Sequence, residues 1–432
     1  MCISGAVQHE KLALFCGKAP FTHAITPRGL PAQTSPGACA KVRATVFLPF
    51  PMRVLRFVLV ALAACWAAWF LWAIAGRPTD TAPSPDPAPL QMHSLGSPQG
   101  RGNLLALQPW LTAQDYASAT TLERKLASYL QAAFDAGWLQ GPKTIAVFPE
   151  YTGTWLVAEG EKRSAIDAAD VGTAMTTVAL THLPSFLYRM ATAPAVAAPD
   201  KWALFTLKAE SMAASYEAVF GNLSRRFGVH VVAGSIVLPQ PELVDGHLRV
   251  HPGAPLVNMS ALFGPDGRIV PPLVIKAFPI DDEKTFTNAG ATGQLPVFNT
   301  PAGTLALLIC ADAWYPQAYA NARQAGATLM AVPSFSAGDR AWQVPWGGYN
   351  GAPNAADVDT RDIGRLTEAQ AWQKYAMVAR APRQGVHTGV NVFLRGQLWD
   401  LGSDGATLAV HAGQAVAQPV RASATITNVW IP

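Results

Sequence analysis

Hydrophobic residues form one long uninterrupted run near the start of the chain and many short stretches after it. The run extends from Phe57 to Ala75 and contains nineteen residues without a charge. At 1.5 Å per residue, a helix of this length covers about 28 Å, which is close to the hydrocarbon thickness of a bilayer. The pattern therefore predicts a transmembrane segment within residues 52–76.

Basic residues mark the orientation of this segment. Residues 1–77 hold eight basic residues and one acidic residue, a net +7, and because the whole chain carries +4 the remainder carries −3. A basic N-terminal flank stays cytoplasmic, so we expect a single-pass protein of the inner membrane with its main domain in the periplasm. Ala73-Ile74-Ala75 also fits a signal-peptide cleavage site, and cleavage after Ala75 would release the domain into the periplasm.

Two further segments flank the apolar run. Residues 1–51 show no clear periodicity, and Met52 followed by Arg53 resembles a start, so we interpret them as a non-native or disordered extension. Residues 77–101 are rich in Pro, Ser and Gly with little to bury, which predicts a semi-extended linker. The remaining residues, 102–432, are expected to form one folded domain.

Strand-like and helix-like stretches alternate through this domain, and such alternation is typical of an α/β architecture. A Gly-Pro-Asp-Gly turn at 264–267 predicts a hairpin between two of the strands. Strands are predicted at residues 103–108, 144–148, 229–237, 256–263, 269–276, 303–310, 328–332 and 389–394. Helices are predicted at residues 119–136, 207–227, 316–325 and 368–380.

Charge and composition exclude several kinds of partner. A slightly acidic domain lacks the basic surface that nucleic-acid phosphates require, so we expect no nucleic-acid binding. The nine histidines have no metal-ligand spacing, and no glycine-rich nucleotide loop precedes a helix, so we expect neither a metal nor a cofactor. Four of the five cysteines lie at or before the apolar run, which leaves Cys310 as the lone thiol of the main domain.

Three reactive side chains follow apolar strands. Glu150 follows the strand at 144–148, Lys276 ends the strand at 269–276, and Cys310 ends the strand at 303–310. Taken singly, each has an ordinary structural interpretation: a surface carboxylate, a lysine at a sheet end and a core cysteine. A thiol at a strand-to-helix turn, however, has backbone N–H groups nearby that can stabilise a thiolate and an oxyanion.

Together, the Pro-Glu after one strand, the lysine at the end of another and the C-x-D-x-x-x-P motif after GTLALLIC resemble the nitrilase superfamily of carbon–nitrogen hydrolases. The resemblance covers about residues 103–410. It implies a four-layer α-β-β-α sandwich that usually assembles into dimers or larger homo-oligomers. It also implies that Glu150, Lys276 and Cys310 form the catalytic triad, and that Glu283 is an additional glutamate in the site.

This resemblance implies hydrolysis of a small-molecule amide or nitrile. Glu150 would take the thiol proton, Cys310 would attack, and Lys276 with the backbone N–H of Ala311 would hold the developing negative charge. Water would then clear the thioester. The neighbouring side chains expected to contact substrate are Tyr151, Trp314 and Phe335.

The chain departs from the family pattern between Glu150 and Lys276, where residues 158–206 are interpreted as an insertion. The stretch 180–190 within it fits a lid, a membrane-facing patch or an ordinary packed helix. A second irregular stretch, 341–351, supplies aromatic side chains that are expected to wall the pocket. These departures prevent a direct transfer of substrate identity from the family.

Three other functions remain open from the sequence. The first is acyl transfer to an amine, as in the membrane apolipoprotein N-acyltransferases, which share this catalytic domain but have several membrane spans. The second is a papain-like pairing of Cys310 with His387, which precedes a predicted strand. The third is a catalytically inactive, membrane-tethered binding domain.

Overall fold

The computed structural model describes residues 52–78, 81–292 and 295–432, so the predicted extension at 1–51 lies outside the described residues. The described chain divides into a short N-terminal unit that ends at Ala75 and a main unit from Gly76 to Pro432. The N-terminal unit holds helix α2 (Met52–Ile74), whose 23 residues are long and apolar enough to cross a membrane. Helix α2 is therefore a candidate membrane span, and a signal sequence would have the same character.

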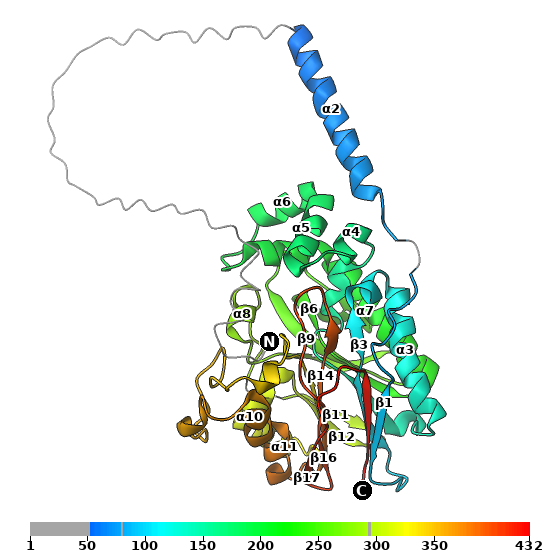
Figure 1. Ribbon diagram of the computed structural model, residues 1–432, viewed down its shortest axis with the longest axis vertical. Helices are drawn as coiled ribbons and strands as arrows, with labels where there is room; N and C mark the ends of the chain where they lie inside the picture. The colour runs from blue at the N-terminus through cyan, green and yellow to red at the C-terminus, as the bar shows by residue number, and fades with distance from the viewer. Residues whose placement is uncertain (1–51, 79–80, 293–294) are drawn as a thin grey trace, which may run out of the picture. The chain divides into compact units, whose positions relative to one another are not determined.

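Two β-sheets form the centre of the main unit (Figure 1). The first sheet has the order β1-β18-β2-β4-β5-β9-β10, with β6 also paired to β9. Its strands are β1 (Gln91–Leu95), β18 (Thr425–Trp430), β2 (Asn103–Gln108), β4 (Thr144–Phe148), β5 (His230–Ala233), β9 (Leu256–Phe263), β10 (Ile269–Ile275) and β6 (Ile236–Pro239). The strands β2, β4 and β5 run parallel and are buried throughout, which explains their continuous apolar sequences.

The second sheet has the order β11-β12-β13-β14-β16-β17. Its strands are β11 (Val297–Thr300), β12 (Gly303–Leu307), β13 (Leu329–Ser334), β14 (Thr388–Phe393), β16 (Leu408–His411) and β17 (Gln414–Ala417). The strands β12, β13 and β14 are parallel to one another. The two sheets face each other through contacts of β14 with β2 and β4 and of β13 with β4, which places the apolar core between them.

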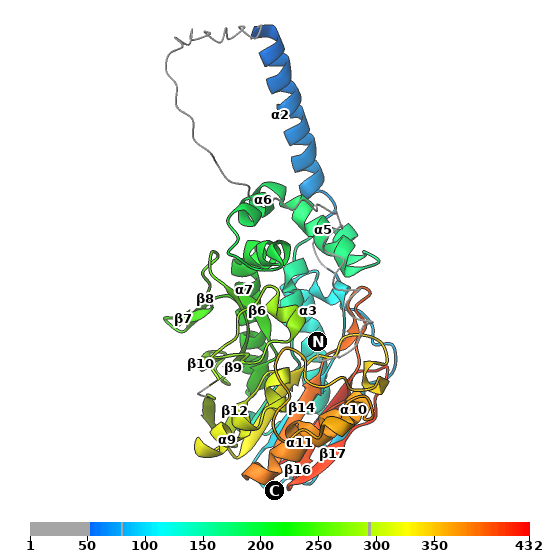
Figure 2. The same cartoon turned by 90° about the vertical axis from the view of Figure 1, so that its left-hand side faces the viewer.

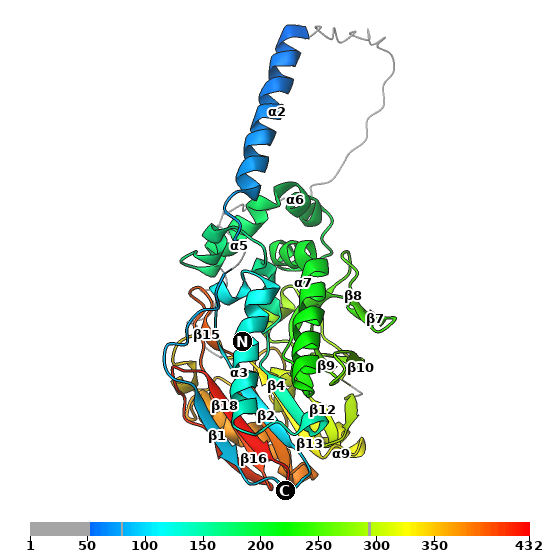
Figure 3. The same ribbon diagram turned by 90° about the vertical axis from the view of Figure 1, so that its right-hand side faces the viewer.

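Helices cover the outer face of each sheet. On the first sheet lie α3 (Ala119–Asp135) and α7 (Pro199–Phe227), as Figure 3 shows. Near the second sheet lie α9 (Pro316–Gln324), α10 (Glu368–Tyr375) and α11 (Met377–Arg380), as Figure 2 shows. These layers confirm the predicted four-layer α-β-β-α sandwich.

Local sequence explains where the covering helices begin and end. Ser118 caps α3 by accepting a hydrogen bond from the backbone N–H of Thr121. Helix α7 begins at Pro199, eight residues before the predicted start, and ends at Gly228, whose φ of +65° suits glycine. The predicted helix 368–380 is divided into α10 and α11, because Ala376 adopts an extended conformation between them.

The insertion at 158–206 is helical in the structure. It contains α4 (Arg163–Ile166), α5 (Val171–Thr181) and α6 (Leu183–Ala191), and it continues into α7. Helix α6 packs beside α7, yet none of its residues is fully buried. Of the three interpretations of 180–190, the packed helix agrees with the contact of α6 with α7, although α6 has no fully buried residue.

The structure corrects the predicted linker at 77–101. Within it, β1 pairs in parallel with β18 and extends the first sheet. The buried Ser84 donates its backbone N–H and its hydroxyl to the carboxylate of Asp115, both at 2.7 Å. Composition suggested a tether, but strand pairing uses backbone groups that composition does not reveal. The main unit therefore begins near Gly76 rather than at residue 102.

Candidate active site

The candidate site centres on a buried lysine at the end of β10. Lys276 Nζ lies 2.8 Å from Glu150 Oε1 and 2.7 Å from Glu283 Oε2. All three side chains are at most 1% exposed. Burial alone would lower the pKa of Lys276, but the two carboxylates outweigh it and raise the pKa well above its usual value. The lysine is therefore held in its charged form.

Glu150 occupies the turn after β4, and the chain is constrained on both sides of it. The next residue, Tyr151, has a φ of +63° and donates its backbone N–H to Ser235 Oγ at 2.9 Å. Ser235 follows Gly234, where an added Cβ would lie 2.1 Å from the carbonyl oxygen of Pro149. This close approach explains why the predicted strand 229–237 is divided into β5 and β6.

One carboxylate oxygen of Glu150 has no hydrogen-bond partner among the described residues. Its Oε1 accepts hydrogen bonds from Lys276 Nζ and from Asn258 Nδ2, the latter at 3.0 Å. No described residue donates a hydrogen bond to the buried Oε2. A buried carboxylate oxygen without a partner is energetically unfavourable, and such an atom in a site is a natural acceptor for a substrate or thiol proton.

Glu283 has the most completely satisfied carboxylate of the site. It lies in the short helix α8 (Asp281–Lys284) and accepts hydrogen bonds from Asn258 Nδ2, from the hydroxyl of Tyr151 and from the N–H of Ile280. Burial would raise its pKa, but the charge and hydrogen bond of Lys276 and the bond from Tyr151 hold the pKa at about 2. Glu283 is therefore ionised across the physiological range.

Cys310 begins the turn η5 (Cys310–Trp314), which follows the end of β12. The strand ends at Leu307, three residues earlier than predicted, and Cys310 is buried with a φ of +47°. Strained backbone of this kind persists where the surroundings fix it, often at functional sites. Its Sγ lies 3.9 Å from the carbonyl oxygen of Phe335, and a negative charge on this sulfur would add to the effects that raise the pKa of Lys276.

Asp312 joins the cysteine turn to the lysine strand. Its Oδ1 accepts the backbone N–H groups of Ala277 at 3.0 Å and Phe278 at 2.8 Å, and its Oδ2 accepts that of Ile309 at 3.3 Å. Burial raises the pKa of Asp312 to about 7, against the opposing effects of Lys276 and the three donors. This carboxyl group therefore fixes the residues next to Lys276 against the residue before Cys310.

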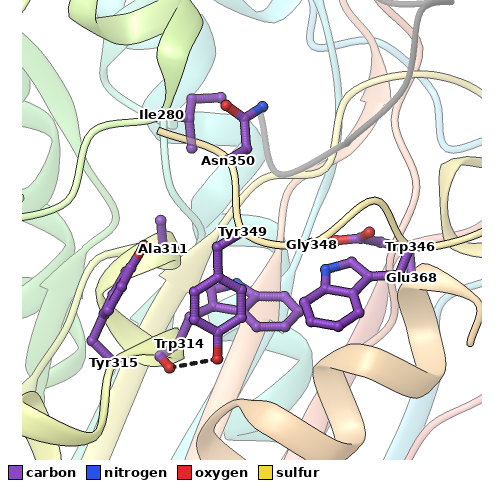
Figure 4. A pocket seen from close by; sticks show the side chains of 9 residues that line it. All are labelled: Ile280, Ala311, Trp314, Tyr315, Trp346, Gly348, Tyr349, Asn350 and Glu368. Carbon is purple, nitrogen blue, oxygen red and sulfur yellow. Dashed lines mark hydrogen bonds between the residues drawn. The ribbon is translucent and has the colours of Figure 1, made fainter. Parts of the chain in front are cut away.

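Two cavities lie beside the candidate site, and one of them borders the nucleophile turn. The first is lined by Ala311 and by aromatic rings, including Trp314, Trp346 and Tyr349, together with the buried carboxylate of Glu368 (Figure 4). The Tyr349 hydroxyl donates a hydrogen bond to the carbonyl oxygen of Trp314 at 2.9 Å. Trp346 and Tyr349 belong to the stretch 341–351, so part of this stretch walls a cavity as expected.

The second cavity is larger, with a volume of about 720 Å³ including its open mouth. Tyr151, Glu283 and Phe335 line it on the side of the site. The rings of Tyr151 and Phe335 meet edge to face, with their centroids 5.9 Å apart. Of the three residues expected to contact substrate, Trp314 therefore lies in the first cavity, and Tyr151 and Phe335 lie in the second.

The structure brings together Glu150, Lys276 and Glu283 through direct hydrogen bonds. The turn of Cys310 is linked to them through Asp312, which bonds the backbone next to Lys276. Sequence reasoning assigned no role to Asn258, which bridges the two glutamates. The sequence feature that could have indicated it is an amide within the largely apolar strand β9. Asp312 was recognised only as part of the cysteine motif.

The papain-like pairing of Cys310 with His387 is wrong. Cys310 follows the C-terminal end of β12, whereas His387 precedes the N-terminal end of β14. Because β12, β13 and β14 are parallel, the two residues lie at opposite edges of the sheet, roughly 20 Å apart for strands of this length. His387 is also exposed to solvent.

Metal binding has no support in the described part of the chain. Among residues 52–78, 81–292 and 295–432, no group of three His, Cys, Asp or Glu side chains is placed to hold a metal ion. The carboxylates of Glu150, Glu283 and Asp312 bond to the Lys276 ammonium or to backbone N–H groups.

Comparison with known proteins identifies the family. The family model for carbon–nitrogen hydrolases matches residues 124–349, more than half of the chain, so the protein belongs to the carbon–nitrogen hydrolase family. This family is part of the nitrilase superfamily that the cysteine, lysine and glutamate motifs resemble. The curated proteins include no match.

Similar solved structures include forms of an amidase from Nesterenkonia sp. AN1. A glutamate-to-glutamine mutant, with the acetamide moiety of fluoroacetamide covalently added at its active-site cysteine, is 16% identical, with a TM-score of 0.47. The match covers 78% of this chain and 94% of that one. A cysteine-to-alanine mutant of the same amidase is 15% identical, with a TM-score of 0.46, over 76% of this chain and 90% of that one.

Proposed function

We propose that this protein hydrolyses non-peptide carbon–nitrogen bonds of amides through a thioester on Cys310. The observation that carries the proposal is the buried Lys276 ammonium, which contacts Glu150 and Glu283 and lies beside the strained cysteine turn. A positive charge fixed next to a thiol and next to a carboxylate with one free oxygen is the arrangement that acyl transfer to sulfur requires.

In the first half-reaction, Glu150 takes the proton of Cys310 as Sγ forms a bond to the carbonyl carbon. The resulting oxyanion is stabilised by Lys276 Nζ and by the N–H of Ala311, the residue after the nucleophile. The carbon–nitrogen bond then breaks, and Glu150 returns its proton to the departing nitrogen. Ammonia or an amine leaves, and the acyl group remains as a thioester.

In the second half-reaction, water attacks the thioester and gives a proton to Glu150. The carbon–sulfur bond breaks, the carboxylic acid leaves, and the proton returns to the Cys310 sulfur. Glu283 and Asn258 take no proton in this scheme. They hold Lys276 and Glu150 in place and keep the lysine charged in a buried environment.

The substrate contacts follow from the two cavities. Trp314 would contact one side of the reacting group, and Tyr151 and Phe335 the other. Amides and nitriles both present an electrophilic carbon to the thiol. A panel of amides and nitriles, assayed for ammonia release, therefore decides which of the two the protein accepts.

The residue that carries the acyl group can be mapped directly. The protein is incubated with an accepted amide, quenched in acid and digested, and the peptide containing Cys310 is analysed by mass. We expect an acyl adduct on Cys310 that hydroxylamine removes. An acyl adduct on a different residue would overturn the proposal.

We also propose that α2 anchors the protein in the inner membrane with the main unit in the periplasm. The support is the length of α2 and the basic residues Arg53 and Arg56 at its N-terminal end. Protease treatment of intact spheroplasts should digest the main unit, and its protection would contradict this orientation. Assembly into a homo-oligomer stays a prediction, which sedimentation of the detergent-solubilised protein tests.

Acyl transfer to an amine uses the same first half-reaction and differs only in the acceptor. Supplying an amine together with an accepted amide distinguishes the two activities, because transfer yields a new amide and hydrolysis yields a carboxylic acid. We expect the acid as the main product. An inactive binding domain would produce neither.

A further inference from the structure

The larger of the two cavities beside the site has a mostly apolar wall, with Lys201, Asp282 and Glu283 as its charged lining residues. The insertion supplies much of the apolar part. Helix α5 contributes Val171 and Met175, and helix α7 contributes Leu204 and Phe205. These residues lie within 158–206, the segment by which the chain departs from the family pattern. The insertion therefore encloses a cavity rather than only covering the surface.

This cavity is lined by residues that contact the reacting groups. Glu283, which lines it, accepts a hydrogen bond from Lys276 Nζ at 2.7 Å. Phe335 also lines it, and the carbonyl oxygen of Phe335 lies 3.9 Å from Cys310 Sγ. A group bound to the carbon that Cys310 attacks can therefore extend from the sulfur past Phe335 into the cavity.

The insertion is fixed in this position by a buried ion cluster. Glu161 Oε1 lies 2.6 Å from Lys208 Nζ, on α7, and 2.8 Å from His182 Nε2. Glu161 Oε2 accepts a hydrogen bond from the hydroxyl of Thr181, the last residue of α5, at 3.1 Å. Because the cluster joins α5 to α7, the two helices that wall the cavity form one preorganised support.

The two cavities have different linings, and each lining suits a different part of the substrate. The released nitrogen becomes protonated and carries positive charge, which matches the aromatic rings and the Glu368 carboxylate of the smaller cavity. An acyl group made of methylenes or an aryl ring matches the apolar wall that α5 and α7 provide.

We propose that the substrate carries an extended apolar acyl group, and that the cavity walled by α5 and α7 binds it. This inference rests on the proposed amide hydrolysis at Cys310 and adds the substrate class. Each buried methylene contributes about 0.8 kcal/mol, so kcat/KM should rise about four-fold per methylene until the cavity is filled.

The test measures kcat/KM for ammonia release from linear primary amides, from acetamide to decanamide. Met175→Trp fills the cavity, so kcat/KM should no longer rise from acetamide to the longer amides. Leu187→Trp is the matched control, because Leu187 belongs to the same insertion, is 55% exposed and does not line the cavity. It should keep the full chain-length dependence.

Several outcomes would overturn the inference without touching the proposed hydrolysis. One is an equal kcat/KM for every chain length in the wild type. Another is a kcat/KM that falls by the same factor for all amides in Met175→Trp, with an unchanged melting temperature. A third is a kcat/KM that rises with the length of the N-alkyl group of N-alkyl acetamides but not with the length of the acyl chain. If Met175→Trp does not fold, Val171→Phe carries the same expectation. Failure of every amide, acetamide included, would instead contradict the proposed hydrolysis.

Discussion

Lys276 Nζ lies 2.8 Å from Glu150 Oε1, although 126 residues separate the two in the sequence and both are buried. Removing two such charges from water is unfavourable, and their attraction offsets it only if the geometry is good and the remaining polar atoms are satisfied. Glu283 accepts a hydrogen bond from Lys276, and Asn258 donates one to Oε1 of Glu150, so these polar atoms are satisfied. Oε2 of Glu150 is the oxygen of this group that has no hydrogen-bond partner among the described residues.

Replacing the lysine tests this arrangement. Lys276→Met keeps an unbranched side chain, one atom shorter, but leaves two buried carboxylates without a counter-charge. We expect the free energy of unfolding to fall by about 3–5 kcal/mol. Loss of an oxyanion donor should lower kcat by at least about 10²-fold. Urea unfolding and ammonia release measure the two effects.

The matched control is Lys284→Met, because this lysine is exposed and forms an ion pair with the exposed Asp281 at 3.4 Å. We expect its free energy of unfolding to change by less than about 0.5 kcal/mol. A Lys276→Met variant that resembled this control in both stability and activity would contradict the electrostatic role of Lys276.

Asp312 is expected to act as a positioning residue. In Asp312→Asn one carboxylate oxygen becomes an NH₂ group, which cannot accept the N–H bonds that Asp312 now receives. We expect a loss of about 1–3 kcal/mol in stability and a lower kcat with little change in KM, since the turn of Cys310 shifts relative to Lys276. Asp167→Asn, an exposed change, is the control.

The pH dependence of the same variant separates positioning from simple destabilisation. The pKa of Asp312 is raised to about 7 by burial, so its stabilising contribution is full below its unfolded value near 4 and is lost as pH rises through about 7. Asp312→Asn should remove this part of the stability profile between pH 4 and 7. An unchanged profile would contradict the raised pKa.

The stability that Glu283 contributes changes with pH in the opposite direction. Its pKa is held at about 2, below the ordinary value of 4.5, so its stabilising contribution is present above about pH 4.5 and is lost as pH falls towards 2. Glu283→Gln should therefore flatten the acid limb of the stability curve between pH 4.5 and 2. Thermal unfolding at a series of pH values measures this, and an acid limb as steep as that of the wild type would contradict it.

The buried Glu161 cluster should hold the insertion to the rest of the main unit. The pKa of Glu161 is lowered to about 2, because the bonds from His182 and Lys208 outweigh the effect of burial. We expect Glu161→Gln to reduce stability by about 3–5 kcal/mol and to increase hydrogen exchange in α5. Glu210→Gln, at an exposed position of α7, should change neither.

Much of the fold could be predicted because local pattern determines it. The largely apolar sequences of β4 and β9 predict the bounds of both strands, and the turn at 264–267 predicts the hairpin between β9 and β10. Where the observed element boundaries differ from the predicted ones, the cause is a contact between segments distant in the sequence. The division of 229–237 results from the contact of Gly234 with Pro149, and the strand character of β1 comes from its pairing with β18.

The site shows the same division between local and long-range information. Glu150, Lys276 and Cys310 could be recognised because each follows an apolar strand and matches a family motif. Asn258, Asp312 and Glu161 could not be assigned, because their roles depend on partners that only the folded chain brings near. The two cavities likewise depend on side chains from several distant segments.

The most direct test of the account is ammonia release by Cys310→Ala from an amide that the wild type hydrolyses, with circular dichroism as a check of folding. Cys65→Ala, which removes the thiol within α2, is the matched control. We predict that Cys310→Ala keeps its fold and loses at least about 10³-fold in rate, whereas Cys65→Ala keeps the wild-type rate. A folded Cys310→Ala protein that releases ammonia within tenfold of the wild-type rate would contradict the account.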